Sequence, residues 1–259
     1  MYKTLIAYRR YILKNAMAEV RIRYAGTSLG ALWNIIHPLT IVLILGAVLS
    51  GFGSARGVQG GMSMSLYVAC GLIPWLALAD SVSRGTTALV QDAAFLKKLP
   101  IPEEVYIAKS VVSSSIHFVT LLALLAVIAL VAKGSASVIW LLGVPAALLL
   151  MLLTFGFALA LSPLNVVVRD VSQAVPAILQ IGLWMSPILY PEELAPNALQ
   201  KLQLINPFAP FLSAFRQIII ADAAPPAHTW IAMVAWTLAA GAVGTLILHR
   251  LRSEIRDLV

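Results

Sequence analysis

Residues 138–162 read VIWLLGVPAALLLMLLTFGFALALS, a run of apolar side chains without a charge. A helix of this composition is long enough to cross a bilayer, which takes about 20 apolar residues. The whole chain has the same character, since 60% of its 259 residues are hydrophobic and 11% are charged. Soluble domains carry about 25% charged residues, so the composition excludes disorder and an ordinary water-soluble enzyme. We expect an all-α membrane protein.

Similar apolar runs recur along the rest of the chain. Together they predict six transmembrane helices, at about 29–50, 66–88, 108–132, 138–162, 174–190 and 228–248. The fifth run is short and ends near Pro187 and Pro191. An even number of spans places both termini on one side of the membrane. The chain therefore divides into residues 1–28 and a transmembrane domain over residues 29–259.

The basic residues indicate which side the termini occupy. With six spans, 14 of the 18 Lys and Arg residues fall on the side of the termini, and the others are Arg56, Lys133, Lys201 and Arg216. Cytoplasmic loops carry the excess of basic residues in membrane proteins, so both termini are expected in the cytoplasm. The net charge of +7 then belongs to one membrane face, and no nucleic-acid partner is expected. No cleavable signal peptide is apparent, because the first apolar run follows a long charged segment.

Residues 1–28 have the pattern of a basic amphipathic helix. Its basic face carries Lys3, Arg10, Lys14 and Arg21, and another face carries Leu5, Tyr8, Ile12, Ala16 and Val20. Such a helix is suited to lying among cytoplasmic lipid headgroups. The alternative is a solvated helix packed on neighbouring protein.

Motifs of nucleotide-binding and metal enzymes are missing. No Gly-Lys pair occurs, which excludes a Walker A loop, and there is no His-Glu-x-x-His or Gly-x-Ser-x-Gly motif. The histidines are far apart and the only cysteine, Cys70, lies in an apolar run. We therefore expect no catalytic residue, no metal site and no cofactor on this chain. His117 follows Ser110, Ser113 and Ser114 along the third span, a stripe typical of helix–helix contacts.

Few ionisable groups lie inside the predicted spans. Asp80 and Arg84 are one helical turn apart in the second span, in the order that favours a structural ion pair. No other acid lies clearly inside a span. Ion-coupled transporters need such groups near the middle of the bilayer, so a secondary transporter is disfavoured and the energy is expected from a partner.

Five stretches in order along nearly the whole chain carry a family resemblance. They are RYAGTSLGALWNIIHP at 23–38, RGTTALVQDAAFLKKLPIPEEVYIAKS at 84–110, Asn165 with Arg169-Asp170, SPILY at 186–190, and Asn206-Pro207 with Phe215-Arg216. Together they resemble the membrane subunits of ABC transporters that export O-antigens, capsules and teichoic acids. One departure is that two acids, Glu103 and Glu104, follow Pro102, where the family often has a basic residue.

The resemblance implies an assembly and a substrate. Such permeases are similar in having six spans per chain, forming homodimers and pairing with two copies of a separate ATPase that binds ATP and Mg. The implied function is export of a lipid-linked polysaccharide across the bacterial inner (plasma) membrane. The alternatives are an ABC permease of similar fold for a drug or smaller lipid, and a structural or assembly protein.

Two cytoplasmic sites follow from the resemblance. The connection between spans 2 and 3 is expected to dock on the ATPase through Lys97, Lys98, Pro100, Pro102, Glu103 and Glu104. After span 4 come Asn165, Arg169 and Asp170; helical spacing would place Asn165 and Arg169 on one face, and Arg169 is suited to pairing with an acid or a lipid phosphate.

Polar and aromatic stripes predict a sugar conduit at the dimer axis. On span 5 the stripe is Gln173, Ala177, Gln180, Trp184 and Pro187, and at the start of span 1 it is Trp33, His37 and Thr40. Aromatic rings stack on sugar faces and amides bind hydroxyls, so the expected channel-lining residues are Trp33, His37, Thr40, Gln173, Gln180, Trp184 and Tyr190. The alternative is dimer packing with an interfacial aromatic belt.

Residues 196–221 are too apolar for a free external loop and too short for two crossings. Asn206-Pro207 breaks the stretch near its middle, because proline restricts the preceding residue to extended conformations. We expect a re-entrant helical hairpin between spans 5 and 6. Its outer-gate residues would be Asn206, Pro207, Phe208, Phe211, Phe215 and Arg216, with Arg216 close to Glu192 or Glu193. The alternative is a helix lying flat on the outer surface.

Overall fold

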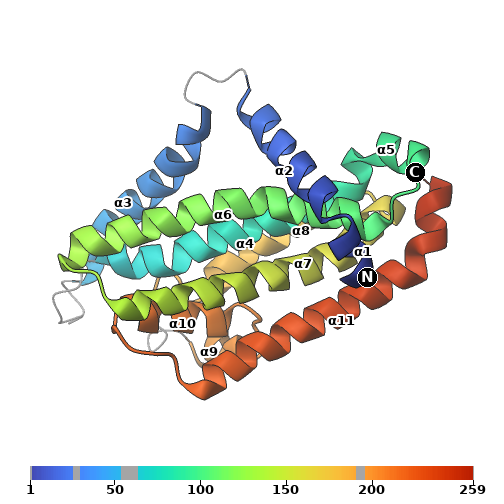
Figure 1. The fold of residues 1–259 in the computed structure, drawn as a ribbon. Coiled ribbons are helices and arrows are strands. Elements are labelled where there is room, and N and C mark those ends of the chain that lie inside the picture. Colours follow the sequence, from blue (N-terminus) through green and yellow to red (C-terminus); the bar gives the residue numbers. More distant parts are fainter. Residues whose placement is uncertain (1, 26–29, 54–63, 191–195, 259) are drawn as a thin grey trace.

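The computed structural model describes residues 2–25, 30–53, 64–190 and 196–258, and every regular element in these ranges is a helix. The elements are α1 (Tyr2–Ala7), α2 (Arg9–Tyr24), η1 (Gly30–Leu32), α3 (Trp33–Gly53), α4 (Met64–Gln91), α5 (Ala93–Lys98), α6 (Glu103–Lys133), η2 (Val138–Leu142), α7 (Gly143–Val167), α8 (Val171–Met185), α9 (Asn197–Gln203), α10 (Ala209–Ile219) and α11 (Ala227–Leu258). The long helices run side by side, and both termini lie toward one end of the bundle (Figure 1). The all-α class is confirmed.

Four of the described helical segments are long and apolar enough to cross a membrane. They are Met64–Gln91, Glu103–Lys133, Val138–Val167 and Ala227–Ile255. The apolar parts of α3 and α8 are shorter, Trp33–Leu49 and Val171–Met185. The 15 residues of α8 rise about 22 Å, less than a hydrocarbon core of about 30 Å. Four spans are therefore supported, and the count of six stays a prediction.

Several helix ends differ from the predicted boundaries. The third span begins earlier, at Glu103, and the last continues to Leu258, because charged residues that leave the membrane continue a helix readily. The fifth ends earlier, at Met185, where Ser186 is extended with ψ of 144°. Pro187 follows, and the residue before a proline is disfavoured in the helical region.

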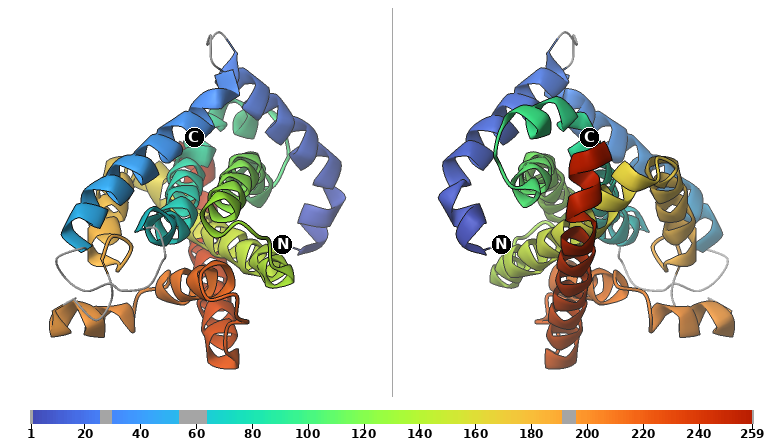
Figure 2. Two further views of the ribbon diagram at one scale, coloured as in Figure 1. Left: turned by 90° about the vertical axis from the view of Figure 1, so that its left-hand side faces the viewer. Right: turned by 90° about the vertical axis from the view of Figure 1, so that its right-hand side faces the viewer.

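Helix α4 is the centre of the bundle, in contact with α3, α6, α7, α8 and α10 (Figures 1 and 2). Its most apolar stretch is 72% buried, against 22–28% for the other three spans. The outer helices leave many large apolar side chains exposed, including Val119, Val131, Leu148 and Leu238. Apolar surface of this extent indicates a membrane or protein environment.

Helices α7 and α11 touch backbone to backbone. A Cβ atom on Gly244 would lie 2.3 Å from the carbonyl oxygen of Gly156, and one on Gly156 would lie 2.7 Å from the nitrogen of Gly241. Small residues permit this approach between membrane helices. The seam holds α11 along α7 (Figure 1).

The N-terminal helices α1 and α2 pack on the start of α6. Ile12 is buried with Val105 and Ala108. Lys109 Nζ lies 3.4 Å from Glu19 Oε2, and Arg23 donates a hydrogen bond of 3.2 Å to Ser113 Oγ. One face of α2 therefore packs on protein. Residues 26–29, which include the predicted domain boundary, lie outside the described residues.

Candidate functional site

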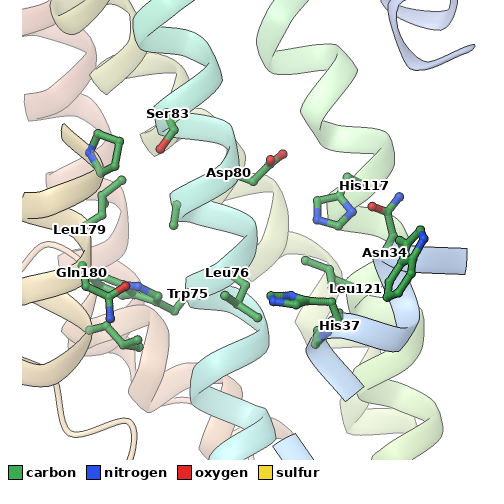
Figure 3. Close-up of a pocket in the computed structure, with 15 residues that line it drawn as sticks. Asn34, His37, Trp75, Leu76, Asp80, Ser83, His117, Leu121, Leu179 and Gln180 are labelled. Carbon is green, nitrogen blue, oxygen red and sulfur yellow. The ribbon is translucent and has the colours of Figure 1, made fainter. Parts of the chain in front are cut away.

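A groove of about 620 Å³ lies between α3, α4, α6 and α8. Aromatic and polar side chains from four helices share it: Trp33, Asn34, His37, Trp75, Asp80, Ser83, His117 and Gln180. Figure 3 shows Asp80 in the middle of the groove, with Asn34 and His117 to one side and Gln180 on the opposite wall. The recess between the central helix and the two short apolar helices therefore has a mixed lining, in which these side chains stand among apolar ones such as Leu76, Leu121 and Leu179.

Asp80 gives the groove its charged group. Arg84 Nε donates to Asp80 Oδ1 at 2.8 Å, which confirms the ion pair expected from their spacing. The other oxygen, Asp80 Oδ2, and His117 Nδ1 are buried atoms without a hydrogen-bond partner in the described residues. Buried polar atoms without partners are costly. Neither atom is open to the groove, and the exposed side chains of Trp33 and Gln180 are the groups that a ligand there would reach.

Three of the predicted channel-lining residues come together in this groove, namely Trp33, His37 and Gln180. The other four do not line it: Thr40, Gln173, Trp184 and Tyr190. Thr40 donates to the carbonyl oxygen of Ile36 on its own helix, at 2.7 Å. The α8 stripe is nevertheless on an open face, with Trp184 59% exposed.

Sequence reasoning does not find the α4 and α6 sides of the groove. It interprets Asp80 as part of an ion pair and His117 as a helix–helix contact, and it does not single out Trp75. The available signal was their polarity inside apolar runs, which marks functional positions in membrane helices. Helix packing brings these residues together. Gly182 of α8 makes room for the Trp75 ring of α4, because a Cβ atom on Gly182 would lie 2.9 Å from that ring.

The end of α8 is joined to the predicted gate stretch by hydrogen bonds. Gln203 Nε2 and the Tyr190 hydroxyl both donate to the carbonyl oxygen of Met185, at 2.9 and 3.0 Å. Asn206 Nδ2 donates to Ser186 Oγ at 2.9 Å. The last carbonyls of a helix need donors from outside it, and Gln203 and Tyr190 provide them for Met185.

Arg216 completes this junction. Its Nη2 donates to the carbonyl oxygen of Pro187 at 2.5 Å, and its guanidinium lies 3.9 Å from the centre of the Tyr67 ring. The acids suggested as its partners, Glu192 and Glu193, lie outside the described residues. The carbonyl oxygens of Pro187 and Ile188 and the ring of Tyr67 are thus among its partners.

The gate stretch forms two short helices, α9 and α10, on either side of Asn206-Pro207. The predicted break is present at this position. Phe208, Phe211 and Phe215 are fully buried, and Phe208 meets Trp75 edge-on with 4.9 Å between ring centres. The segment after α9 is open, with Leu204 82% exposed. Phe208, directly after the break, thus packs on Trp75 of the groove.

A polar cluster joins α6, η2 and the segment after α10. Lys133 forms an ion pair with Asp222 and donates to the carbonyl oxygens of Ile219 and Ile220 at 3.0 and 3.1 Å. Trp140 Nε1 donates to Asp222 Oδ1 at 2.9 Å. These hydrogen bonds, first that of Lys133, hold the pKa of Asp222 below its usual range. Asp222 has a φ of 48°, a conformation that Asp tolerates better than most residues.

The predicted ATPase-docking segment divides into two parts. Lys97, Lys98 and Pro100 are exposed, at the end of α5 and just after it. Glu103 and Glu104 are buried in the first turn of α6 and paired with Arg252 of α11. The two acids therefore turn inward toward Arg252, and the first turn of a helix also stabilises their negative charge. Pro102 is partly buried between the two parts.

The motif after the fourth span also differs from the expectation. Helix α7 ends at Val167 and Val168 is extended, so Asn165 and Arg169 do not share a helical face. Asn165 is buried, and its Oδ1 accepts a hydrogen bond of 3.0 Å from the amide of Ser172 in the first turn of α8. Arg169 and Asp170 are exposed. Asn165 thus fixes the start of α8 to the end of α7.

Residues 12–220 match the family described as ABC-2 type transporter. The chain is 25% identical over 203 residues to the O-antigen export system permease protein RfbA of Klebsiella pneumoniae, covering 78% of this chain and 77% of that protein. It is 27% identical over 243 residues to the RfbA of Myxococcus xanthus, covering 91% and 90%. It is 22% identical over 239 residues to the polysialic acid transport protein KpsM of Escherichia coli, covering 92% of each. Since this match covers most of the chain, the protein belongs to the ABC-2 type transporter family.

Proposed function

We propose that this chain is the membrane permease of an ABC exporter for a lipid-linked polysaccharide. It works as a homodimer with two copies of a separate ATPase, and moves the glycan from the cytoplasm to the outer face of the inner membrane. The proposal is supported by three relatives, two named as O-antigen export permeases and one as a polysialic acid transport protein.

The groove is the observation that carries this proposal. Trp33 offers an exposed aromatic face for sugar rings, while Asp80, His117 and Gln180 line the groove with hydrogen-bonding side chains. A site for an acyl chain needs no hydrogen-bonding side chains, and the relatives that the chain resembles are named for glycan export and not for drugs. We therefore favour a glycan over the alternative substrates.

The open side of the groove supports a dimer. Trp33 is 54% exposed at the groove, and α8 also exposes Trp184 and Ile181 at 59% and 58%. Large aromatic residues on a membrane helix are suited to a partner subunit or to a substrate path. In our proposal two copies face each other across α3 and α8, and each supplies half of the conduit.

The cytoplasmic elements give the ATPase a place to dock. Lys97, Lys98 and Pro100 form the exposed contact, close to a hollow of about 550 Å³ lined by residues 96–103. Helix α2 turns Leu13 and Met17 outward, both about half exposed. Exposed apolar residues beside basic ones suit the cytoplasmic headgroup layer, which would place the termini in the cytoplasm.

Helices α9 and α10 are proposed as the outer gate. They dip into the outer leaflet as a re-entrant hairpin, with Asn206-Pro207 at the turn. Backbone groups at such a turn must be satisfied within the protein. The amide of Phe208 donates to Asn206 Oδ1 at 3.0 Å and that of Asn206 donates to the carbonyl oxygen of Gln203 at 3.2 Å, which fits this requirement.

Deletion and reconstitution test the proposed function. A strain lacking this permease should lose a surface glycan and accumulate its lipid-linked form inside the cell, and the wild-type gene should restore export. The purified permease should bind the ATPase in a complex with two copies of each chain. Unchanged surface glycan in the deletion strain, with sensitivity to a drug instead, would favour the alternative permease.

A further inference from the structure

Arg252, near the end of α11, binds two carboxylates that open α6. Its Nε lies 3.0 Å from Glu103 Oε2, and its Nη2 lies 2.5 Å from Glu104 Oε2. The carboxylate side chains are only 2% and 6% exposed, whereas that of Arg252 is 37% exposed. One guanidinium thus reaches from the chain's last helix to two buried acids.

These acids directly follow the segment that we assign to ATPase docking. Pro102 is the N-cap of α6, and Glu103 and Glu104 occupy its first turn. The free amides there stabilise the carboxylates, but buried charges still need a cation. Arg252 therefore fixes the direction in which the docking segment enters α6.

Helix α11 links Arg252 to the other helices of the bundle. Leu248 and Ile255 of α11 share an apolar cluster with Ile107 of α6 and Ala158 of α7. The Gly244–Gly156 seam holds α11 to α7 along its length. Asn165, at the end of α7, in turn holds the start of α8, a wall of the groove.

The beginning of the docking segment is held separately. Lys109 of α6 lies 2.5 Å from Asp92, the N-cap of α5, and 3.4 Å from Glu19 of α2. The segment from Asp92 to Glu104 is therefore tied to α2 at one end and to α11 at the other. The two ties involve different residues and can be tested one at a time.

We propose that Arg252 is a positioning residue for energy coupling. It makes the docking segment and α11 move together, so that motion of the ATPase reaches α7 and α8 as well as α4 and α6. This inference rests on the proposed function, since it takes residues 97–104 as the ATPase contact. Arg252 touches neither nucleotide nor glycan.

The test compares two arginines of the same helix in the full complex with the ATPase. Arg252→Gln removes the contact with both acids, and Arg250→Gln is the control, because Arg250 is exposed and loses the same charge. ATP hydrolysis and glycan export are measured together in liposomes. We expect Arg252→Gln to assemble and hydrolyse ATP, but to export about tenfold less glycan per ATP. Arg250→Gln should match the wild type.

Two further variants separate positioning from folding. Arg252→Lys keeps the charge without the planar fork and should recover part of the export ratio. The exchanged pair Arg252→Glu with Glu104→Arg should recover more than either change alone. If both variants assemble but export as little glycan per ATP as Arg252→Gln, the contact of Arg252 with Glu103 and Glu104 is not what couples ATP hydrolysis to export.

An unchanged export ratio in Arg252→Gln would overturn the proposal. So would a loss of assembly with the ATPase that Arg252→Lys does not repair, because the residue would then serve folding alone. A wild-type complex that hydrolyses ATP but exports no glycan would instead contradict the proposed function.

Discussion

The α7–α11 seam and the groove are built in opposite ways. At the seam, glycines bring two backbones into contact, and a Cβ on Gly244 has no space. At the groove, α3 and α8 stand apart around Asp80 and leave about 620 Å³ open. Close-packed helices move as one body, while sparsely packed elements supply the moving parts of a protein. The contrast shows a close-packed side at the seam and an open side at the groove, and the open side is where we propose the glycan path.

The seam should give the largest effect when it is altered. Gly244→Ala places a methyl group 2.3 Å from the Gly156 carbonyl oxygen, so we expect it to lower the free energy of unfolding by about 1–3 kcal/mol. The matched control is Gly241→Ala on the same helix, where a Cβ meets nothing within 4 Å. Thermal unfolding of the purified permease measures both. Equal stability of the two variants would mean that the seam is looser than the structure indicates.

The groove side should respond in function and not in stability. Replacing both Trp33 and Trp184 with Ala should impair export strongly and leave assembly intact, because both side chains are more than half exposed and exposed substitutions cost about 0.5 kcal/mol. Glycan export in cells and complex formation are the measurements. Ile178→Ala, equally exposed on α8, is the control. Normal export and glycan length in the double variant would assign the tryptophans to packing.

The proposed gate tests the open side of the molecule further, because Phe208 of the gate stretch contacts Trp75 of the groove. Leu204→Cys, in a background with Cys70 replaced by Ser, should react slowly with a membrane-impermeant thiol reagent at rest and faster during transport. Leu204 and Val138 are both 82% exposed, so protein cover cannot explain a difference between them. Val138→Cys, at the start of η2, should react faster than Leu204→Cys. Fast labelling of Leu204→Cys in every ATP state would show an open surface loop.

The Lys133–Asp222–Trp140 cluster should show the smallest effect, and only in acid. The pKa of Asp222 is lowered in the fold, so its stabilising contribution is present above the unfolded pKa of about 3.9. It is lost as the pH falls through the lower folded value. Thermal unfolding of wild type and Asp222→Asn should therefore differ by a constant amount from pH 7 to 5, and by less below pH 4. A difference that disappears between pH 7 and 5 would contradict this assignment.

Local features of the site could be predicted from the sequence. The Asp80–Arg84 pair formed as expected, because residues four apart on a helix are neighbours. The break at Asn206-Pro207 also appeared, since proline acts on its immediate neighbour. The prediction that Asn165 and Arg169 share a helical face was wrong, also for a local reason. Helix α7 ends between them, at Val167, and residue spacing does not indicate where a helix ends.

The sequence by itself determined that this protein is helical and belongs in a membrane, because apolar runs and scarce charges act through solvent and through neighbouring residues. Only the tertiary structure decided what those helices enclose. Arg252 and Glu104 are 148 residues apart, and Asp80, His117 and Gln180 come from three helices. Such pairings depend on which faces pack together, and an apolar helix in lipid has little pattern that marks its inner face. The close approach of small residues and the pairing of buried charges decide which helix faces pack together. Both exist only once the bundle is assembled.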